Sequence, residues 1–110
     1  MGEFDGKVAI VTGGALGIGG ATSRKLASEG ARVLIADIDM DAAIANADGI
    51  TTAGGVAQVV RCDVSSHDDI RAMVSAAVEE WGRLDILVQN AYGVASAHGD
   101  SLGSAVTVSE

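Results

Sequence analysis

A glycine-rich turn directly follows a short apolar run near the beginning of the chain. The apolar run spans Val8 to Val11, and the turn reads Thr12-Gly13-Gly14-Ala15-Leu16-Gly17-Ile18-Gly19. Glycines that follow a buried parallel strand let the backbone turn sharply and approach an anionic pyrophosphate. The helix that begins in such a turn directs its first amide groups and the positive end of its dipole toward the same anion. The spacing therefore predicts a dinucleotide site.

An aspartate at the end of the next apolar run strengthens this interpretation. Asp37 lies eighteen residues beyond Gly19, where a carboxylate accepts hydrogen bonds from the ribose hydroxyls of adenosine. The same carboxylate repels a 2′-phosphate, and the neighbouring residues Ala15, Leu16 and Ile38 offer no cation that would hold one. NAD is therefore expected in preference to NADP. The competing interpretation is a solvated loop aspartate.

The turn does not match the phosphate-binding loops of nucleotide hydrolases. Such loops need Gly-x-x-x-x-Gly-Lys-Ser/Thr, but here Gly14 and Gly19 are followed by Gly20 and Ala21. The common dinucleotide pattern Gly-x-Gly-x-x-Gly is not matched either, since Thr22 stands at the position of its last glycine. Taken alone, the turn also fits a purely structural role, so other motifs must decide.

Strands and helices alternate along the chain and place these motifs. The apolar runs predict strands over 7–12, 31–37, 56–62 and 84–89, and helices over 17–29, from Asp39 or Asp41 to residue 50, and from Ser66 to Trp81. Such alternation implies parallel pairing through right-handed crossovers. We therefore expect an α/β fold, a Rossmann-like three-layer sandwich with a parallel sheet of about four strands in the order 3-2-1-4. The first two helices would cover one face of the sheet and the third helix the other.

Each predicted helix repeats residues at three- and four-residue spacing on the side that must face the sheet. The residues expected to point inward are Ile18, Thr22 and Leu26 in the first helix, Ala43, Ala47 and Ile50 in the second, and Ile70, Met73, Val74, Ala77, Val78 and Trp81 in the third. The third helix also begins with Ser66 and Asp69, whose Ser-x-x-Asp spacing resembles a capping box. The pattern predicts one core on each side of the sheet.

The composition fits one domain and excludes several classes of partner. At 110 residues with a net charge of −8, the chain buries enough surface for one modest core and lacks the basic patch on which nucleic-acid binding depends. Cys62 is the only cysteine and is expected to be a buried structural thiol, which fits a reducing compartment. The sequence shows no recognisable signal peptide, and no apolar stretch approaches the length of ~18 residues that a membrane span needs. We therefore expect a soluble, cytoplasmic protein.

Together these residues resemble the amino-terminal half of a classical short-chain dehydrogenase/reductase. Thr12 to Gly19 matches that family's Thr-Gly-x-x-x-Gly-x-Gly loop, Asp63-Val64 matches its adenine-binding Asp-Val pair, and Gln89 to Tyr92 aligns with its Asn-Asn-Ala-Gly stretch. The resemblance covers residues 4–91, and it implies an NAD-binding Rossmann half-domain over residues 1–91, followed by a divergent tail at 92–110. It implies a set of cofactor-binding residues, namely Gly13, Ala15, Leu16, Gly17, Ile18, Gly19, Asp37, Ile38, Asp63, Val64, Asn90 and Ala91.

The catalytic residues of that family have no counterpart in this sequence. The family uses an upstream serine and a Tyr-x-x-x-Lys pair, in which the tyrosine acts as acid and base. Here the lysines are Lys7 and Lys25, and Tyr92 is followed four residues later by Ser96. Tyr92 also replaces a family glycine at a point where the backbone should approach the cofactor. We therefore predict no catalytic residue in these 110 residues.

The two histidines do not indicate another chemistry. His67 falls in the first turn of the predicted third helix, where it is expected to be solvated or to cap the helix. His98 and Asp100 supply too few ligands for a metal ion. No metal site is therefore predicted.

Three functional hypotheses follow from these observations. In the first, a truncated or naturally short chain is the NAD-binding portion of an oxidoreductase of this family and is unable to transfer hydride alone. In the second, it is a non-enzymatic Rossmann-fold interaction module that no longer binds dinucleotide, and in the third another polypeptide supplies the missing half. Without the rest of the family's sheet, the strand at 84–89 would be an exposed edge. The alternating residues 105–109 could add to this strand or swap into a second copy of the chain. A homodimer or higher homo-oligomer is therefore expected.

Overall fold

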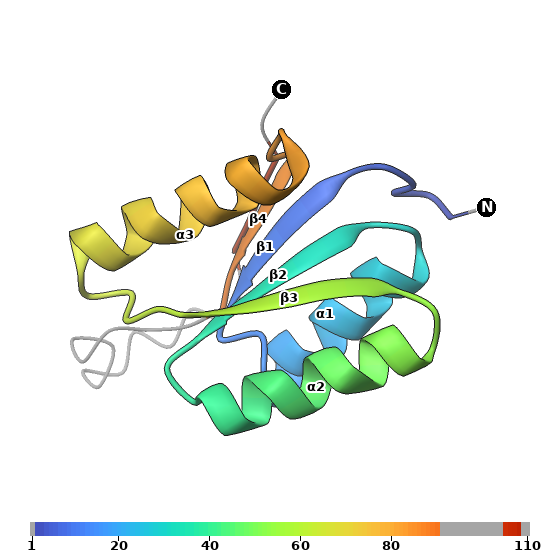
Figure 1. Cartoon of the computed structure of the whole chain (residues 1–110), viewed down its shortest axis with the longest axis horizontal. Coiled ribbons are helices and arrows are strands. Elements are labelled where there is room, and N and C mark those ends of the chain that lie inside the picture. Colours follow the sequence, from blue (N-terminus) through green and yellow to red (C-terminus); the bar gives the residue numbers. More distant parts are fainter. Residues whose placement is uncertain (1, 91–104, 109–110) are drawn as a thin grey trace.

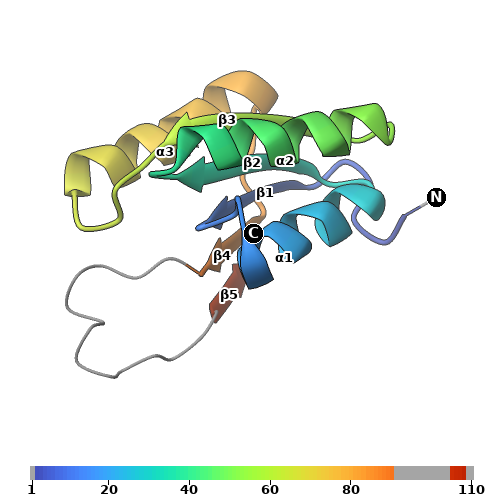
Figure 2. The same ribbon diagram turned by 90° about the horizontal axis from the view of Figure 1, so that it is seen from below.

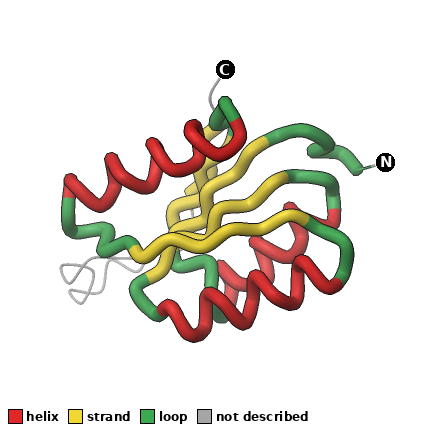
Figure 3. The backbone as a smooth tube through the Cα atoms, viewed as in Figure 1, coloured by secondary structure: helices red, strands yellow, loops and turns green. Residues whose placement is uncertain are grey.

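The computed structural model describes residues 2–90 and the backbone of residues 105–108. The elements follow the order β1 (Val8–Thr12), α1 (Gly17–Ser28), β2 (Arg32–Asp37), α2 (Met40–Thr52), β3 (Val56–Arg61), α3 (His67–Trp81), β4 (Ile86–Gln89) and β5 (Ala105–Val108). Strands and helices alternate through β4 as the sequence predicts (Figure 1 and Figure 3). In the described part of the chain, no helix combines the length and apolar character needed to cross a membrane.

The strands form one sheet in the order β3-β2-β1-β4-β5. The first four strands in the chain pair in parallel, which confirms the predicted order 3-2-1-4. The fifth strand, β5, pairs antiparallel with β4 and places Ala105 opposite Gln89. The alternating residues 105–108 therefore add to β4, one of the two arrangements expected for them. The edge position predicted for β4 belongs instead to β5 (Figure 2).

Helices α1 and α2 cover one face of the sheet and α3 covers the other (Figure 1). Successive side chains along a strand point to opposite faces. In β1, Ala9 and Val11 accordingly pack beneath α1 and α2, whereas Val8 and Ile10 pack beneath α3. This alternation produces two cores, as predicted, and the inward residues predicted for α2 are all buried: Ala43, Ala47 and Ile50.

The inward face of α1 lies one residue away from the predicted one. Of the three residues expected inward, only Leu26 is buried, and Ile18 is 70% exposed. The helix instead contacts the sheet through a row that begins at Gly19 and continues through Ser23. A Cβ atom at Gly19 would collide with the carbonyl oxygen of Gly13. Apolar periodicity misses this face because glycines, which have no side chain, form its first turn.

The stripe predicted for α3 is only partly buried. Met73 and Ala77 lie in the core and Trp81 packs against it, whereas Ile70 and Val78 at the borders of the stripe remain exposed. The described elements therefore cover a narrower band of this helix than the sequence predicts.

The predicted capping box of α3 is half formed. The Ser66 hydroxyl accepts a hydrogen bond from the amide of Asp69 at 3.2 Å, as an N-cap should. The Asp69 carboxylate does not return this bond to Ser66 but accepts one from the amide of Asp63 at 2.9 Å. The capping-box pattern therefore supplies only the Ser66 cap, because the Ser66 amide donates instead to the Asp63 carbonyl at 2.9 Å.

A buried carboxylate anchors β4 to β1. Asp85, 6% exposed, accepts a hydrogen bond from the amide of Val8 at 2.9 Å. Its other partner is the Arg83 guanidinium, which donates to the two carboxylate oxygens at 2.8 and 2.6 Å. This guanidinium, assisted by the Val8 amide, lowers the pKa of Asp85 below its ordinary value despite burial. The carboxylate therefore stays ionised where the two central strands begin.

Candidate functional site

The carboxyl ends of the parallel strands meet at one edge of the sheet. Thr12 at the end of β1 lies beside Ala36 of β2 on one side and Gln89 of β4 on the other. Asp37 ends β2 and lies beside Arg61 at the end of β3. In open α/β sheets, ligands bind outside these ends, where the chain reverses the direction of strand addition. The structure therefore brings the predicted motifs to the edge where such a ligand would lie.

The turn after β1 has a shape that only glycine permits. Gly17 has φ +60°, in the left-handed region, and a Cβ atom added to it would meet no neighbouring atom within 4 Å. Gly19 has the opposite environment, because a Cβ atom there would collide with the Gly13 carbonyl and would lie 2.5 Å from Nδ2 of the Asn90 side chain. The first of these glycines keeps the outer side of the turn open, and the second lets α1 begin directly against the sheet.

Helix α1 begins differently from the other helices of the described chain. Its N-cap, Leu16, makes no side-chain hydrogen bond, and its first turn carries no acidic residue. In contrast, Asp39 caps α2 and Ser66 caps α3 through side-chain oxygens. The first turn of a helix presents amide groups that need an acceptor and carries partial positive charge. This end of α1 is therefore suited to an anion supplied from outside the chain.

Three large apolar side chains surround this turn without packing into the core. Leu16, Ile18 and Ile38 are 65%, 70% and 59% exposed, respectively. Ala15, between β1 and Leu16, is buried. Apolar side chains beside a few polar groups are typical of a small-molecule site.

The carboxylate of Asp37 is fixed against the glycine-rich turn. Its Oδ2 accepts a hydrogen bond from the Ala15 amide at 3.1 Å, and its Oδ1 accepts one from the Asp39 amide at 3.0 Å. A carboxylate oxygen accepts more than one hydrogen bond, so these contacts leave capacity for a ligand hydroxyl. The sequence predicted this residue near the turn, and the structure places the two in direct contact.

The Asp63-Val64 pair follows the end of β3, the strand next to β2 in the sheet. The amide and hydroxyl of Ser65 donate hydrogen bonds to Asp63 Oδ1 at 2.9 and 2.6 Å. These bonds lower the pKa of the Asp63 carboxyl below its ordinary value. Val64 is half-buried and packs against the core beneath α3. The pair is thus held in place by its own turn and by the core.

The end of β4 joins the turn from the opposite side. The Asn90 amide donates to the Thr12 hydroxyl at 3.0 Å, and the Asn90 side chain donates to the Gly13 carbonyl at 3.3 Å. Ala91, which is also predicted to bind the cofactor, lies outside the described residues. The same holds for Tyr92, His98 and Asp100, which the sequence analysis considered for other roles.

A buried polar cluster beneath the turn was not predicted. The Gly14 carbonyl accepts hydrogen bonds from the Ser23 hydroxyl at 3.1 Å and from the side-chain amide of Asn46 at 2.9 Å. Asn46 belongs to α2, where the sequence pattern assigns inward positions to alanine and isoleucine. A lone asparagine between Ala43 and Ala47 on the inward side of an amphipathic helix was the signal that could have revealed this contact.

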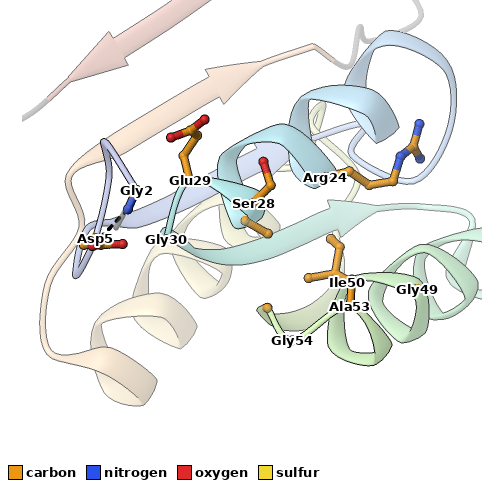
Figure 4. Close-up of a pocket in the computed structure, with 12 residues that line it drawn as sticks. Gly2, Asp5, Arg24, Ser28, Glu29, Gly30, Gly49, Ile50, Ala53 and Gly54 are labelled. Carbon is orange, nitrogen blue, oxygen red and sulfur yellow. Dashed lines mark hydrogen bonds between the residues drawn. The ribbon is translucent and has the colours of Figure 1, made fainter.

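A separate hollow of about 840 Å³ lies between α1 and α2 (Figure 4). Its lining includes Arg24 and Ser28 from α1 and the C-cap residue Glu29. The other side includes Ile50 from α2 and Gly54 from the turn after it. None of the residues predicted to bind a cofactor lines this hollow. The candidate site is therefore the strand edge with its glycine-rich turn, where the predicted residues gather.

Comparison with known proteins finds one family over most of the chain. Residues 7–106 match the family model described as short chain dehydrogenase. Tropinone reductase-like 1 from Erythroxylum coca is 47% identical over 89 residues, which cover 81% of this chain and 32% of that relative.

Solved structures show the same fold. The crystal structure of hydroxysteroid dehydrogenase from Escherichia coli has a TM-score of 0.79 and 42% identity, over 82% of this chain and 38% of that one. A short chain dehydrogenase/reductase from Burkholderia phymatum, solved in complex with NAD, has a TM-score of 0.75 and 40% identity, over 79% and 31%. The chain thus spans about a third of the length of these relatives.

Proposed function

The chain belongs to the short-chain dehydrogenase family, and on that premise we propose that it is the NAD-binding portion of an oxidoreductase. The observation that carries this proposal is the Asp37 carboxylate, which is fixed on the Ala15 amide beside the open first turn of α1. This arrangement places a carboxylate that can accept hydrogen bonds from ribose hydroxyls beside backbone amides that can donate to a phosphate.

The residues at the strand edge fit a dinucleotide. The backbone amides of Leu16, Gly17 and Ile18 would hold the pyrophosphate, because no side chain caps this end of α1. Asp37 would accept hydrogen bonds from the adenosine ribose, and Asp63 with Val64 would bind adenine. The backbone at Asn90 and Ala91 would lie along the other ribose, and the apolar side chain of Ile38 would border the adenosine. When bound, NAD supplies the hydride acceptor of the reaction.

The preference for NAD over NADP follows from charge. A 2′-phosphate on the adenosine ribose would approach the Asp37 carboxylate and meet like charge. Ile38, the next residue along the chain, is exposed and apolar and offers no compensating cation. We therefore expect NADP to bind more weakly than NAD.

Hydride transfer by these 110 residues alone is not expected. The sequence has no Tyr-x-x-x-Lys pair, and both of its lysines, Lys7 and Lys25, come before the place in the chain where the family has this pair. We propose that residues 1–91 act as the cofactor-binding unit and that 92–110 are a distinct tail. Formation of NADH from a panel of alcohols by the pure chain would contradict this part of the proposal.

Calorimetric titration with NAD tests the cofactor site. We expect Asp37→Ala to weaken NAD binding about 10- to 100-fold, because hydrogen bonds to a charged acceptor contribute roughly 1.5–3 kcal/mol each. Asp48→Ala is the matched control, since it removes the same charge from an exposed position on α2 and should leave the affinity unchanged. Absence of NAD binding by the unaltered chain would contradict the proposal. Equal affinity of the Asp37→Ala variant would contradict the role of this carboxylate.

We further propose that two copies of the chain associate. The observation that favours this is the position of β5 at the outer edge of the sheet, because an exposed edge strand can pair with another chain. Light scattering at micromolar concentration checks this assembly, and a strictly monomeric mass would contradict it.

A further inference from the structure

We propose that Asn46 is a positioning residue that sets the orientation of the glycine-rich turn toward a bound pyrophosphate. Asn46 lies in α2, and its side chain reaches the Gly14 carbonyl from 32 residues away in the sequence. The inference rests on the proposed function, since it assigns a role in binding the same dinucleotide.

The peptide group between Gly14 and Ala15 is held at both ends. Its carbonyl oxygen accepts a hydrogen bond from Asn46 Nδ2 at 2.9 Å. The Ser23 hydroxyl lies 3.1 Å from the same oxygen and shares its one proton between it and the Gly19 carbonyl at 2.9 Å. The N–H group of the peptide donates to Asp37 Oδ2 at 3.1 Å. A peptide group is planar, so fixing both ends fixes the direction in which the chain enters Leu16 and the first turn of α1. Asn46 thereby acts on the turn that would face the pyrophosphate.

The orientation of the Asn46 amide follows from its other partner. Arg24 Nη1 lies 3.0 Å from Asn46 Oδ1, and a guanidinium has only donors. The oxygen of the amide must therefore face Arg24, which leaves the NH₂ group for the carbonyls of Gly14 and, at 3.4 Å, Gly20. Asn46 is 8% exposed. Its two donors and its acceptor are thus committed to the turn and to α1.

A change at Asn46 should affect one part of the ligand more than another. Adenosine lacks the pyrophosphate and would contact Asp37, Asp63 and Val64, none of which bonds directly to Asn46. Asp37 is linked to Asn46 only through the Gly14–Ala15 peptide group, and the Asp39 amide holds its carboxylate independently. NAD and ADP-ribose carry the pyrophosphate and would depend on the orientation of the turn. A positioning role therefore predicts selective loss of affinity for the pyrophosphate ligands, whereas a merely structural role predicts loss for all three.

The experiment uses the isosteric variant Asn46→Asp, which replaces the donor NH₂ by a carboxylate oxygen that repels the Gly14 carbonyl. The matched control is Ala45→Asp, which adds the same charge at an exposed position of the same helix. NAD and ADP-ribose are titrated by calorimetry and adenosine by NMR chemical shifts, with folding checked by circular dichroism. We expect Asn46→Asp to lower the affinities for NAD and ADP-ribose about tenfold. The affinity for adenosine should stay within about twofold of that of the unaltered chain. Ala45→Asp should change none of the three affinities.

Each other outcome has a definite meaning. Unchanged NAD affinity in Asn46→Asp, or an equal loss for adenosine, would overturn the positioning role. Failure of the unaltered chain to bind NAD would overturn the proposed function itself, which separates the two failures. Should Asn46→Asp not fold, Arg24→Ala decides the question, because it removes only the exposed guanidinium that orients the amide. It should weaken NAD but not adenosine, and equal affinities for NAD would overturn the inference.

Discussion

Replacement of Gly19 by alanine tests whether the first turn of α1 depends on a contact that admits no side chain. An alanine Cβ atom would collide with the backbone carbonyl of Gly13 and would come within 2.5 Å of Asn90 Nδ2. The Asn90 side chain can move away, but the Gly13 carbonyl belongs to the turn between β1 and α1. The turn itself must therefore shift.

The size of the effect follows from three contributions. Overpacking costs typically ~1–3 kcal/mol, and loss of the Asn90 to Gly13 hydrogen bond costs ~0.5–1.5 kcal/mol. The higher helix propensity of alanine offsets about 1 kcal/mol of this loss in the free energy of unfolding. We therefore expect Gly19→Ala to lower the free energy of unfolding by about 2 kcal/mol, which corresponds to a fall in Tm of roughly 10 °C.

Gly49→Ala is the matched control, because it makes the same change inside α2. A Cβ atom at Gly49 would meet nothing within 4 Å, so only the gain in helix propensity remains. This variant should be more stable than the unaltered chain by roughly 0.5–1 kcal/mol. Urea and thermal unfolding followed by circular dichroism measure both variants. The reasoning fails if Gly19→Ala is as stable as the unaltered chain or if the two variants lose equal stability.

Two further predictions concern the stability of the fold. Asp85 has a pKa lowered chiefly by Arg83, so its contribution is complete above the ordinary aspartate pKa and is lost as the pH falls through the lowered value in the folded state. Asp85→Asn should therefore reduce stability at pH 7 and weaken its acid dependence in urea unfolding, and an unchanged acid dependence would contradict this. Ser66→Ala should cost about 1 kcal/mol by removing the cap of α3, whereas Ser75→Ala, exposed in the middle of the same helix, should be nearly neutral. Equal unfolding midpoints for these two variants would show that the cap contributes nothing.

The order of elements and the meeting of the candidate residues at one edge of the sheet could be predicted because both rest on local sequence. A run of Val and Ile followed by glycines indicates a buried strand and a tight turn wherever it occurs. Asp37 and Asp63 follow such runs, and the carboxyl ends of parallel strands share one edge. The sequence predicts Asp37 at this edge, but its hydrogen bond from the Ala15 amide is seen only in the structure.

Features that depend on distant contacts could not be predicted. Hydrophobic periodicity assigned Ile18 to the sheet because it counts side chains, whereas α1 approaches the sheet through Gly19. The contact from Asn46 to Gly14 joins segments that are separated in the chain by the helix α1 and the strand β2. The partner of Asp69 depends on the path of the turn after β3, in which the Ser66 amide bonds to the Asp63 carbonyl and the Asp63 amide bonds to the Asp69 carboxylate.

The most direct test of the proposed site is a map of amide chemical shifts during titration of the ¹⁵N-labelled chain with NAD. The proposed function predicts that the largest changes gather at residues 13–19, 37–38 and 63–64 and at Asn90, along the carboxyl edge of the parallel strands. Changes confined to the hollow between α1 and α2, around Arg24 and Ile50, or no changes at millimolar NAD, would contradict it.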